Sequence, residues 1–357
     1  MGGRNLALVD ECDAPTGSRV VSGRDALCVG FDLDGSLESL GNSMNDLADA
    51  LTARGDLRLI RFHSLGATES RNENRLAHRA AWVPLWRRSL GRSIDGLLPP
   101  VDVIHVAGLV TPPTRSTPLV ISVDDLRPLR GETRIHQRVA QLRRAVARGA
   151  VLAASSRAAS HEVLQVLGAA RGQVVVVPPA VPRVDPTLFG TDLVVNVTGL
   201  VERFLTLAPG LLRFSTGHGA RLVAIASSRS RQAVRASGLA ITLRSREEAR
   251  DALGAARVVV HISDGARFPS FAIAALSAGV PTIARATAIN RELLEGAAAL
   301  VASDEELLHT LDEAWTSDQR RAILIAAGVS RAVDFSPANA ARAYASLYGD
   351  VVRGWAS

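Results

Sequence analysis

Short apolar runs alternate with longer amphipathic segments along most of the chain. The short runs suit fully buried strands, and the segments between them carry apolar residues at helical spacing. Strands that alternate with helices favour a parallel sheet covered by helices on both faces. In the first half, the expected strands lie at 26–33, 57–63, 101–108, 118–126, 150–156 and 172–181, and the expected helices at 43–55, 133–149 and 157–168.

A proline-rich stretch at 177–190 interrupts this pattern, which then restarts. Further strands are expected at 193–199, 220–228, 239–245, 256–263, 281–285 and 298–303, with helices between them. The sequence therefore predicts an α/β protein with two Rossmann-like, doubly wound domains that face each other across a cleft. The expected divisions are a flexible arm at 1–25, one domain at 26–182, a second at 183–340, and a final helix at 341–357.

Ligands of such sheets bind beyond the carboxyl ends of the strands, which directs attention to the stretch GARFPSFAIAALSAGVPTIAR at 265–285. It predicts a tight loop, an apolar helix that begins near Ser270, and a short strand after the Gly279–Pro281 turn. A helix N-terminus presented by a loop attracts anions, because its first N–H groups and its dipole point outward. An anion site is therefore expected at the start of this helix.

The amino-acid composition excludes several kinds of reaction and partner. All 41 basic residues are arginine, so neither a Schiff-base lysine nor a P-loop lysine is available. The net charge of +6 comes from scattered arginines without a nucleic-acid-binding motif, so no nucleic-acid partner is expected. Two cysteines cannot build a disulfide framework. Because the first residues lack an apolar signal-like core and no run is long enough to span a membrane, a cytoplasmic protein is expected.

Several motifs, taken in order, resemble those of retaining GT-B glycosyltransferases of the GT4 type. They are SVDDLRPLR, VLAASSRAASHEV, VVVVPPAV, VTGLVERFL, SREEARDALGAARVVVHIS, ARFPSFAIAALSAGVPTIA, INRELLEGAAALVAS and YASLYGDV. The resemblance implies an acceptor-binding first domain, a donor-binding second domain and a C-terminal crossover helix at 341–357. It also implies a UDP- or GDP-linked sugar as substrate, with no metal and no other cofactor.

The sequence departs from the family at the donor site. Two glutamates that the family usually carries fall on Ala266 and Ala274, and the lysine of its phosphate-binding pair falls on Phe204. The histidine of the first-domain loop falls on Asp124. Arg203, the other member of the phosphate pair, is retained, and Arg267 is new beside the lost acid.

The expected phosphate contacts combine cations with backbone donors. Arg203 and Arg267 supply guanidinium groups, which bind two phosphate oxygens at once. The N–H groups of Ser270 and Phe271 and the backbone at Gly41 complete this set. As alternatives, Arg203 is a solvated charge at a helix start and Arg267 is a surface loop side chain.

The remaining candidates lie around the nucleoside and the acceptor. Nucleoside contacts are expected at Leu243, Arg244 and Ala274. Catalytic roles are assigned to Asp124 and Asp125, which end a buried strand and could orient a hydroxyl or take a proton, or else form a turn. Acceptor contacts are assigned to Asn42, Ser43 and His105, although Asn42 and Ser43 equally suit a helix cap.

The segment at 75–92 combines tryptophans with arginines, which suits either a membrane surface or a buried pair of helices. Pro84 interrupts it, so membrane contact is not expected. Three functions stay open. They are a glycosyltransferase of bacterial specialised metabolism acting on a small acceptor, including a thiol; an inactive scaffold that kept the fold; and a membrane-associated transferase with a lipid acceptor. Oligomeric state is left open.

Overall fold

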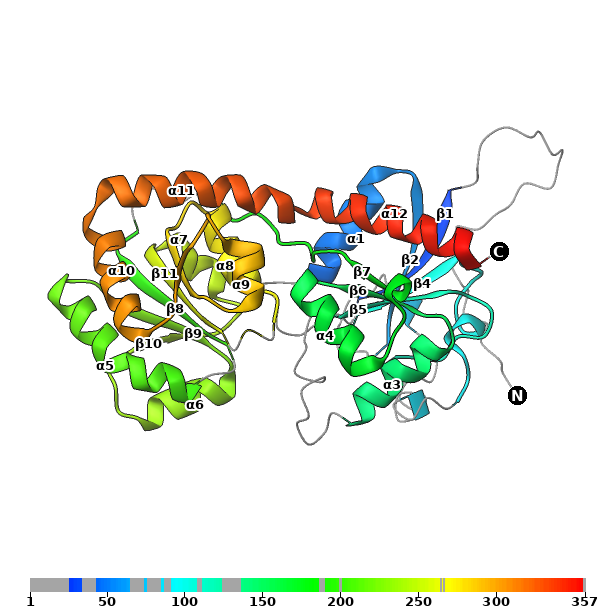
Figure 1. Ribbon diagram of the computed structural model, residues 1–357, viewed down its shortest axis with the longest axis horizontal. Helices are drawn as coiled ribbons and strands as arrows, with labels where there is room; N and C mark the ends of the chain where they lie inside the picture. The colour runs from blue at the N-terminus through cyan, green and yellow to red at the C-terminus, as the bar shows by residue number, and fades with distance from the viewer. Residues whose placement is uncertain are drawn as a thin grey trace, which may run out of the picture.

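The computed structural model contains two α/β domains that lie side by side, with a long C-terminal helix running from the second onto the first (Figure 1). It describes residues 26–33, 43–64, 74–75, 85–86, 91–107, 111–123, 136–185, 190–198, 201–263, 265 and 267–355. The predicted α/β class with two parallel sheets is confirmed.

The first domain is built on a seven-stranded parallel sheet with the order β3-β2-β1-β4-β5-β6-β7. The order reverses between β1 and β4, and this reversal marks the switch point where doubly wound sheets place ligands. The central strands are buried on both faces, which explains their uniformly apolar sequences. Their bounds are β1 Leu27–Asp32, β2 Leu57–His63, β3 Asn74–Arg75, β4 Val103–Ala107, β5 Leu119–Val123, β6 Val151–Ala154 and β7 Val174–Val176.

The connecting helices of this domain are stopped by local signals. The α4 helix is capped by the Ser156 hydroxyl, which accepts from the Ala159 N–H, and it ends at Gly168 in the left-handed region. The helical segments are α1 Ser43–Arg54, η1 Ile94–Gly96, α3 His136–Ala147, α4 Arg157–Leu167 and η3 Arg171–Gln173. Residues 177–185 then form neither helix nor strand.

The second domain is built on a six-stranded parallel sheet with the order β10-β9-β8-β11-β12-β13. Its switch point lies between β8 and β11. The strands are β8 Asp192–Thr198, β9 Leu222–Ala226, β10 Thr242–Arg244, β11 Ala256–Ser263, β12 Thr282–Arg285 and β13 Ala299–Val301. The helical segments are α5 Val201–Gly217, α6 Ser228–Ala236, α7 Ala249–Gly254, α8 Ser270–Ser277, α9 Ala288–Leu294, α10 Asp304–Thr316, α11 Asp318–Ala332 and η4 Val333–Phe335.

The last helix, α12 Pro337–Trp355, leaves the second domain and packs on the first (Figure 1). Its buried residues, including Ala341, Tyr344 and Tyr348, join the apolar core formed by α1 and the strands β1 and β4. The chain therefore crosses between the domains twice, once through residues 177–185 and once through η4. These two crossings touch, because the Val181 N–H donates to the Phe335 carbonyl at 2.8 Å.

The carboxyl edges of the two sheets face each other, as two contacts between helices show. The α4 helix follows β6, and its Arg157 and Ala158 N–H groups donate to the Glu292 carboxylate of α9, which follows β12, at 2.6 and 2.8 Å. Burial raises the pKa of Asp46 in the first turn of α1, and Arg250 on α7 of the other domain opposes that shift. Loops at the two carboxyl edges therefore lie within reach of each other.

Candidate functional site

The loop that carries the expected anion site connects β11 to α8. Gly265 in this loop has a φ of +71°, and a Cβ added there would lie 2.9 Å from the Cβ of Thr287. Only glycine fits both the left-handed backbone and this close approach. The glycine therefore lets the loop pack against Thr287, the residue that caps α9.

The first turn of α8 presents backbone donors rather than side chains. Its N-cap is Pro269, which supplies no side-chain hydrogen bond. The Ser270 N–H already donates to the Phe268 carbonyl at 2.9 Å. The N–H groups of Phe271 and Ala272 belong to the first turn, whose donors have no acceptor inside a helix. Of the two expected backbone donors, Ser270 therefore already has an acceptor, and the phosphate-binding role of both residues stays a prediction.

Two arginines converge on one carboxylate at the carboxyl edge of the second sheet. Arg203 on α5 donates through Nη2 to Oδ1 of Asp304 at 2.5 Å, and Arg285 at the end of β12 donates through Nη1 to the same oxygen at 3.1 Å. Asp304 is the first residue of α10 and follows β13. Two guanidinium groups against one carboxylate leave this cluster with a net positive charge.

Arg285 is a candidate that the sequence reasoning missed. The strand at 281–285 was expected, but nothing in the local pattern showed that its last side chain would meet Arg203. The pairing depends on the sheet order, which places β8 and β12 on either side of β11. An arginine at the carboxyl end of a predicted strand was the only available signal.

Arg267 lies inside the molecule rather than on the surface of the loop. The residue is only 8% exposed, and its neighbour Phe268 packs against Phe335 with ring centroids 5.7 Å apart. The alternative of a solvated surface arginine therefore does not describe it. A phosphate-binding role for Arg267 stays a prediction.

The expected nucleoside contacts are divided between the surface and the core. Arg244, at the end of the edge strand β10, donates to Glu248 Oε1 at 2.8 Å, and Leu243 beside it is half-buried. Ala274 lies within α8 and has no exposed surface. Ala274 is packed among apolar side chains of the core. The roles of these three positions in nucleoside binding stay predictions.

A buried polar pair occupies the switch point below the loop. His261 on β11 and Asn196 on β8 are register partners, and Asn196 Nδ2 lies 3.1 Å from His261 Nδ1. Burial lowers the pKa of His261 to about 4, so the imidazole is neutral near pH 7. Its Nε2 has no hydrogen-bond partner in the described part of the chain. This pair supports the sheet beneath the loop.

Most of the catalytic, phosphate-binding and acceptor-side candidates of the first domain fall outside the described residues. Asp124, Asp125, Gly41 and Asn42 all lie there, and so does the side chain of Ser43, the residue at which α1 begins. The strand β5 ends at Val123, directly before the two aspartates. Their catalytic and binding roles stay predictions.

His105 lies in the core of the first domain, not at a surface that an acceptor could reach. It has no exposed area, its Nδ1 lies 2.7 Å from the Tyr348 hydroxyl, and its Nε2 lies 2.8 Å from the Ser122 hydroxyl. Burial lowers its pKa to about 3. Because both ring nitrogens are occupied within the core, His105 is a structural link between β4 and α12.

Other sequence expectations concern metals and membranes. The described residues contain no group of three or more potential metal-binding side chains. Within the same residues, no helix combines the length and apolar character needed to cross a bilayer. Trp86 belongs to the segment at 75–92 that combines tryptophans with arginines. It is fully buried, and its Nε1 donates to the Arg92 carbonyl at 2.9 Å. Trp82 and Pro84 lie outside the described residues.

Two doubly wound parallel domains with facing carboxyl edges and a C-terminal crossover helix define the GT-B architecture. The resemblance drawn from the sequence motifs is therefore confirmed at the level of the fold. No family model matches the chain, and a search of curated proteins gives no significant match.

Solved glycosyltransferases share this fold at low sequence identity. The Anabaena protein HepE, solved with UDP and glucose, is 16% identical, with a TM-score of 0.61 over 91% of this chain and 100% of its own. Sucrose-phosphate synthase from Thermosynechococcus elongatus is 14% identical, with a TM-score of 0.63 over 92% and 100%. AviGT4, a glycosyltransferase involved in avilamycin A biosynthesis, is 16% identical, with a TM-score of 0.57 over 92% and 98%.

Proposed function

We propose that this protein is a glycosyltransferase that binds the diphosphate of a nucleotide sugar at the carboxyl edge of its second sheet. The observation that carries the proposal is the convergence of Arg203 and Arg285 on Asp304 at that edge. The first turn of α8 supplies N–H donors at the same edge of the sheet. Together these groups form a positively charged site suited to a diphosphate.

The proposed reaction breaks the bond between the anomeric carbon and the diphosphate oxygen. The nucleophilic atom of the acceptor forms the new bond to that carbon, and the diphosphate leaves with increased negative charge. Fixed guanidinium and N–H groups stabilise this charge more in the transition state than in the bound donor. The acceptor loses a proton, for which Asp124 or Asp125 is the proposed base.

The acceptor is proposed to be a small molecule of bacterial specialised metabolism, as in antibiotic assembly. The arginine-only composition, which suits a GC-rich actinobacterial genome, and the fold shared with AviGT4 support this choice. A thiol acceptor fits a site whose family carboxylates are replaced, because a thiol ionises more readily than a hydroxyl and needs a weaker base. UDP or GDP is the proposed nucleotide, and HepE supports UDP.

A scaffold without catalysis is the second candidate. Two observations favour it: alanine stands at both family glutamate positions, and Ala274 is fully buried in the core. The membrane-associated alternative loses support, because Trp86 is buried rather than available to a bilayer.

A thermal-shift screen with UDP, GDP, dTDP and ADP separates the two candidates. A nucleotide present at 100 times its dissociation constant is expected to stabilise the folded protein by about 2.7 kcal/mol. One of the four should do so. If the protein is folded and none of the four raises the melting temperature, the scaffold is the better description.

A further inference from the structure

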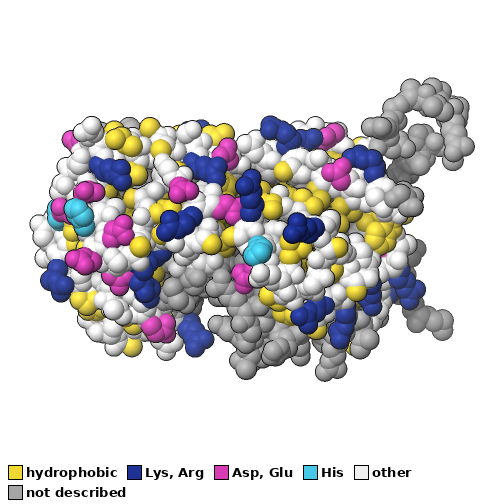
Figure 2. Space-filling view, in the orientation of Figure 1, with side chains coloured by type: hydrophobic (Ala, Val, Ile, Leu, Met, Phe, Trp, Pro, Cys, Tyr) yellow, Lys and Arg dark blue, Asp and Glu magenta, His cyan; other side chains and the backbone are white. Residues whose placement is uncertain are grey.

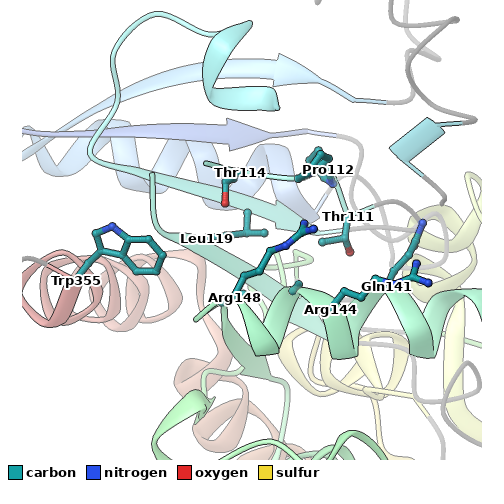
Figure 3. A pocket seen from close by; sticks show the side chains of 11 residues that line it. Thr111, Pro112, Thr114, Leu119, Gln141, Arg144, Arg148 and Trp355 are labelled. Atoms are coloured by element: carbon teal, nitrogen blue, oxygen red, sulfur yellow. The ribbon is translucent and has the colours of Figure 1, made fainter. Parts of the chain in front are cut away.

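The first domain carries a hollow at the amino end of its sheet, between α3 and residues 111–114 (Figure 3). The hollow is shallow: about 360 Å³ of empty space lies in and above it, and this figure includes open solvent. Its apolar lining includes Leu119, the first residue of β5, and Ala150, which directly precedes β6. The hollow therefore lies at the edge opposite the carboxyl ends, away from the proposed diphosphate site.

The polar lining of the hollow is cationic and hydroxylic. Arg144 on α3 and Arg148, which directly follows this helix, line the hollow together with the hydroxyl-bearing residues Thr111 and Thr114. Figure 3 shows the Arg148 side chain extending from just beyond the end of α3 toward the segment that carries these threonines. Among the described residues, no carboxylate lines the hollow and the Arg148 side chain forms no hydrogen bond or ion pair.

Two charged groups of opposite sign lie next to the hollow. Arg138, nearer the start of α3, donates to the Thr111 hydroxyl at 2.8 Å, and burial lowers the pKa of Arg138 to about 10. The carboxylate of Asp95 accepts from the Arg115 and Ser116 N–H groups at 2.8 and 2.9 Å and so fixes the loop next to the hollow. In Figure 2, arginine side chains gather over the α3 region, whereas arginines and carboxylates alternate on the second domain.

Trp355 closes one side of the hollow from the end of α12. Its ring packs against the backbone at Gly149, which has a φ of +90° and where an added Cβ would lie 2.9 Å from the ring. A larger residue at 149 would displace the ring. Gly149 therefore allows the crossover helix to form part of the wall.

We propose that this hollow binds a phosphate group, carried either by a small soluble molecule or by a lipid headgroup. A phosphate offers enough oxygens to accept from the Arg148 fork and from the two threonine hydroxyls at once, and Arg144 adds a positive charge beside them. Because the hollow and the proposed diphosphate site lie at opposite edges of their sheets, phosphate binding here does not depend on the proposed transfer reaction.

Titration calorimetry with inorganic phosphate at constant ionic strength tests the proposal on the full chain. Saturable binding is expected, and the Arg148→Gln variant is expected to weaken it about tenfold, since one charge-assisted contact is lost. Arg148 is exposed, so this change should leave the fold intact. The matched control is Arg235→Gln, which removes an exposed arginine from α6 and should leave phosphate affinity unchanged.

Vesicles with and without phosphatidylglycerol identify the source of the phosphate. If Arg148-dependent co-sedimentation occurs only with the anionic vesicles, the proposal is supported with a lipid headgroup as ligand. Arg148-dependent binding of inorganic phosphate without co-sedimentation supports a soluble ligand. The proposal is overturned if neither probe binds saturably, or if Arg148→Gln and Arg235→Gln weaken binding equally. Saturating UDP should leave the result unchanged.

Discussion

Arginine supplies every strong cation in this chain, and that choice shapes the proposed donor site. A guanidinium presents several N–H groups in a plane, so Arg203 and Arg285 can hold Asp304 and still offer donors to a second anion. A lysine ammonium would act as a single point of charge. The shared carboxylate therefore orders both forks before a ligand arrives, which lowers the entropy lost on binding.

Two buried histidines make stability depend on pH. The folded-state pKa values of His105 and His261 are lowered to about 3 and about 4 by burial, below the ordinary value of 6.5. Their contribution to the free energy of unfolding is therefore fully present above pH 6.5. It is lost as the pH falls toward the folded-state pKa values, because over that range only the unfolded chain takes up the protons. Between its two pKa values, each histidine should make the free energy of unfolding change by about 1.4 kcal/mol per pH unit.

Urea unfolding between pH 6 and pH 4.5 checks this prediction. The free energy of unfolding should fall with pH over that window, and the His261→Gln variant should show a slope shallower by about 1.4 kcal/mol per pH unit. Burial acts to raise the pKa of Asp95, but its N–H donors outweigh burial and lower the pKa to about 2. Asp95 therefore loses its contribution to stability only below this pH window. An identical slope in the wild type and the variant would contradict the assignment of His261.

At the residue scale, the sequence predicts the place of a side chain best when that place follows from its own element. Arg203 was chosen because it starts a helix after a strand, and its phosphate-binding role stays a prediction. His105 was misplaced because the end of a strand does not reveal that a distant helix covers it, as Tyr348 does. Arg285 was missed for the same reason, since its partner Asp304 lies on another element.

At the scale of elements, a buried polar network attaches α12 to the first sheet. The Tyr348 hydroxyl contacts His105, which contacts Ser122, and the Tyr344 hydroxyl lies 2.8 Å from the same serine. Tyr348→Phe leaves one nitrogen of His105 without its partner. The variant should lose about 1–3 kcal/mol of unfolding free energy.

Chemical denaturation of Tyr348→Phe and of Arg353→Gln measures this contribution. Arg353 lies on the same helix with a largely exposed side chain, so its replacement should change stability by less than about 0.5 kcal/mol. Equal stability of the two variants would show that the network does not hold the helix in place.

A contact between α4 and α9, made by Glu292, connects the two domains. Its carboxylate accepts from the Arg157 and Ala158 N–H groups, while Ser156 caps the next N–H of α4. An anion at a helix N-terminus also interacts favourably with the helix dipole. Glu292→Ala should therefore cost about 1 kcal/mol and loosen the contact between α4 and α9.

Small-angle scattering and thermal unfolding test this contact together. Glu292→Ala is expected to increase the radius of gyration and lower the melting temperature. The exposed Glu295 follows α9 directly, and Glu295→Ala serves as the control that should change neither. A radius of gyration unchanged in both variants would mean that Glu292 does not keep the domains together.

At the scale of the whole molecule, the alternation of apolar and amphipathic segments was sufficient to predict two parallel sheets. Parallel strands must be buried on both faces, so their sequences are distinctive even without aromatic residues. The pattern does not specify how helices from one domain meet strands of the other. Contacts such as Glu292 with α4, and the hollow beside Trp355, depend on that assembly and therefore required the structure.

Titration calorimetry of UDP and GDP into matched arginine variants tests the proposed donor site most directly. Arg203→Ala and Arg285→Ala should each weaken binding of the preferred nucleotide by about ten- to a hundredfold, since each removes a charge-assisted contact. Arg221, paired with Asp192 at the amino edge of the same sheet, is the matched control, and Arg221→Ala should leave the affinity unchanged. If the wild type binds neither nucleotide, or if all three variants bind as tightly as the wild type, the carboxyl edge of the second sheet is not a nucleotide-sugar site.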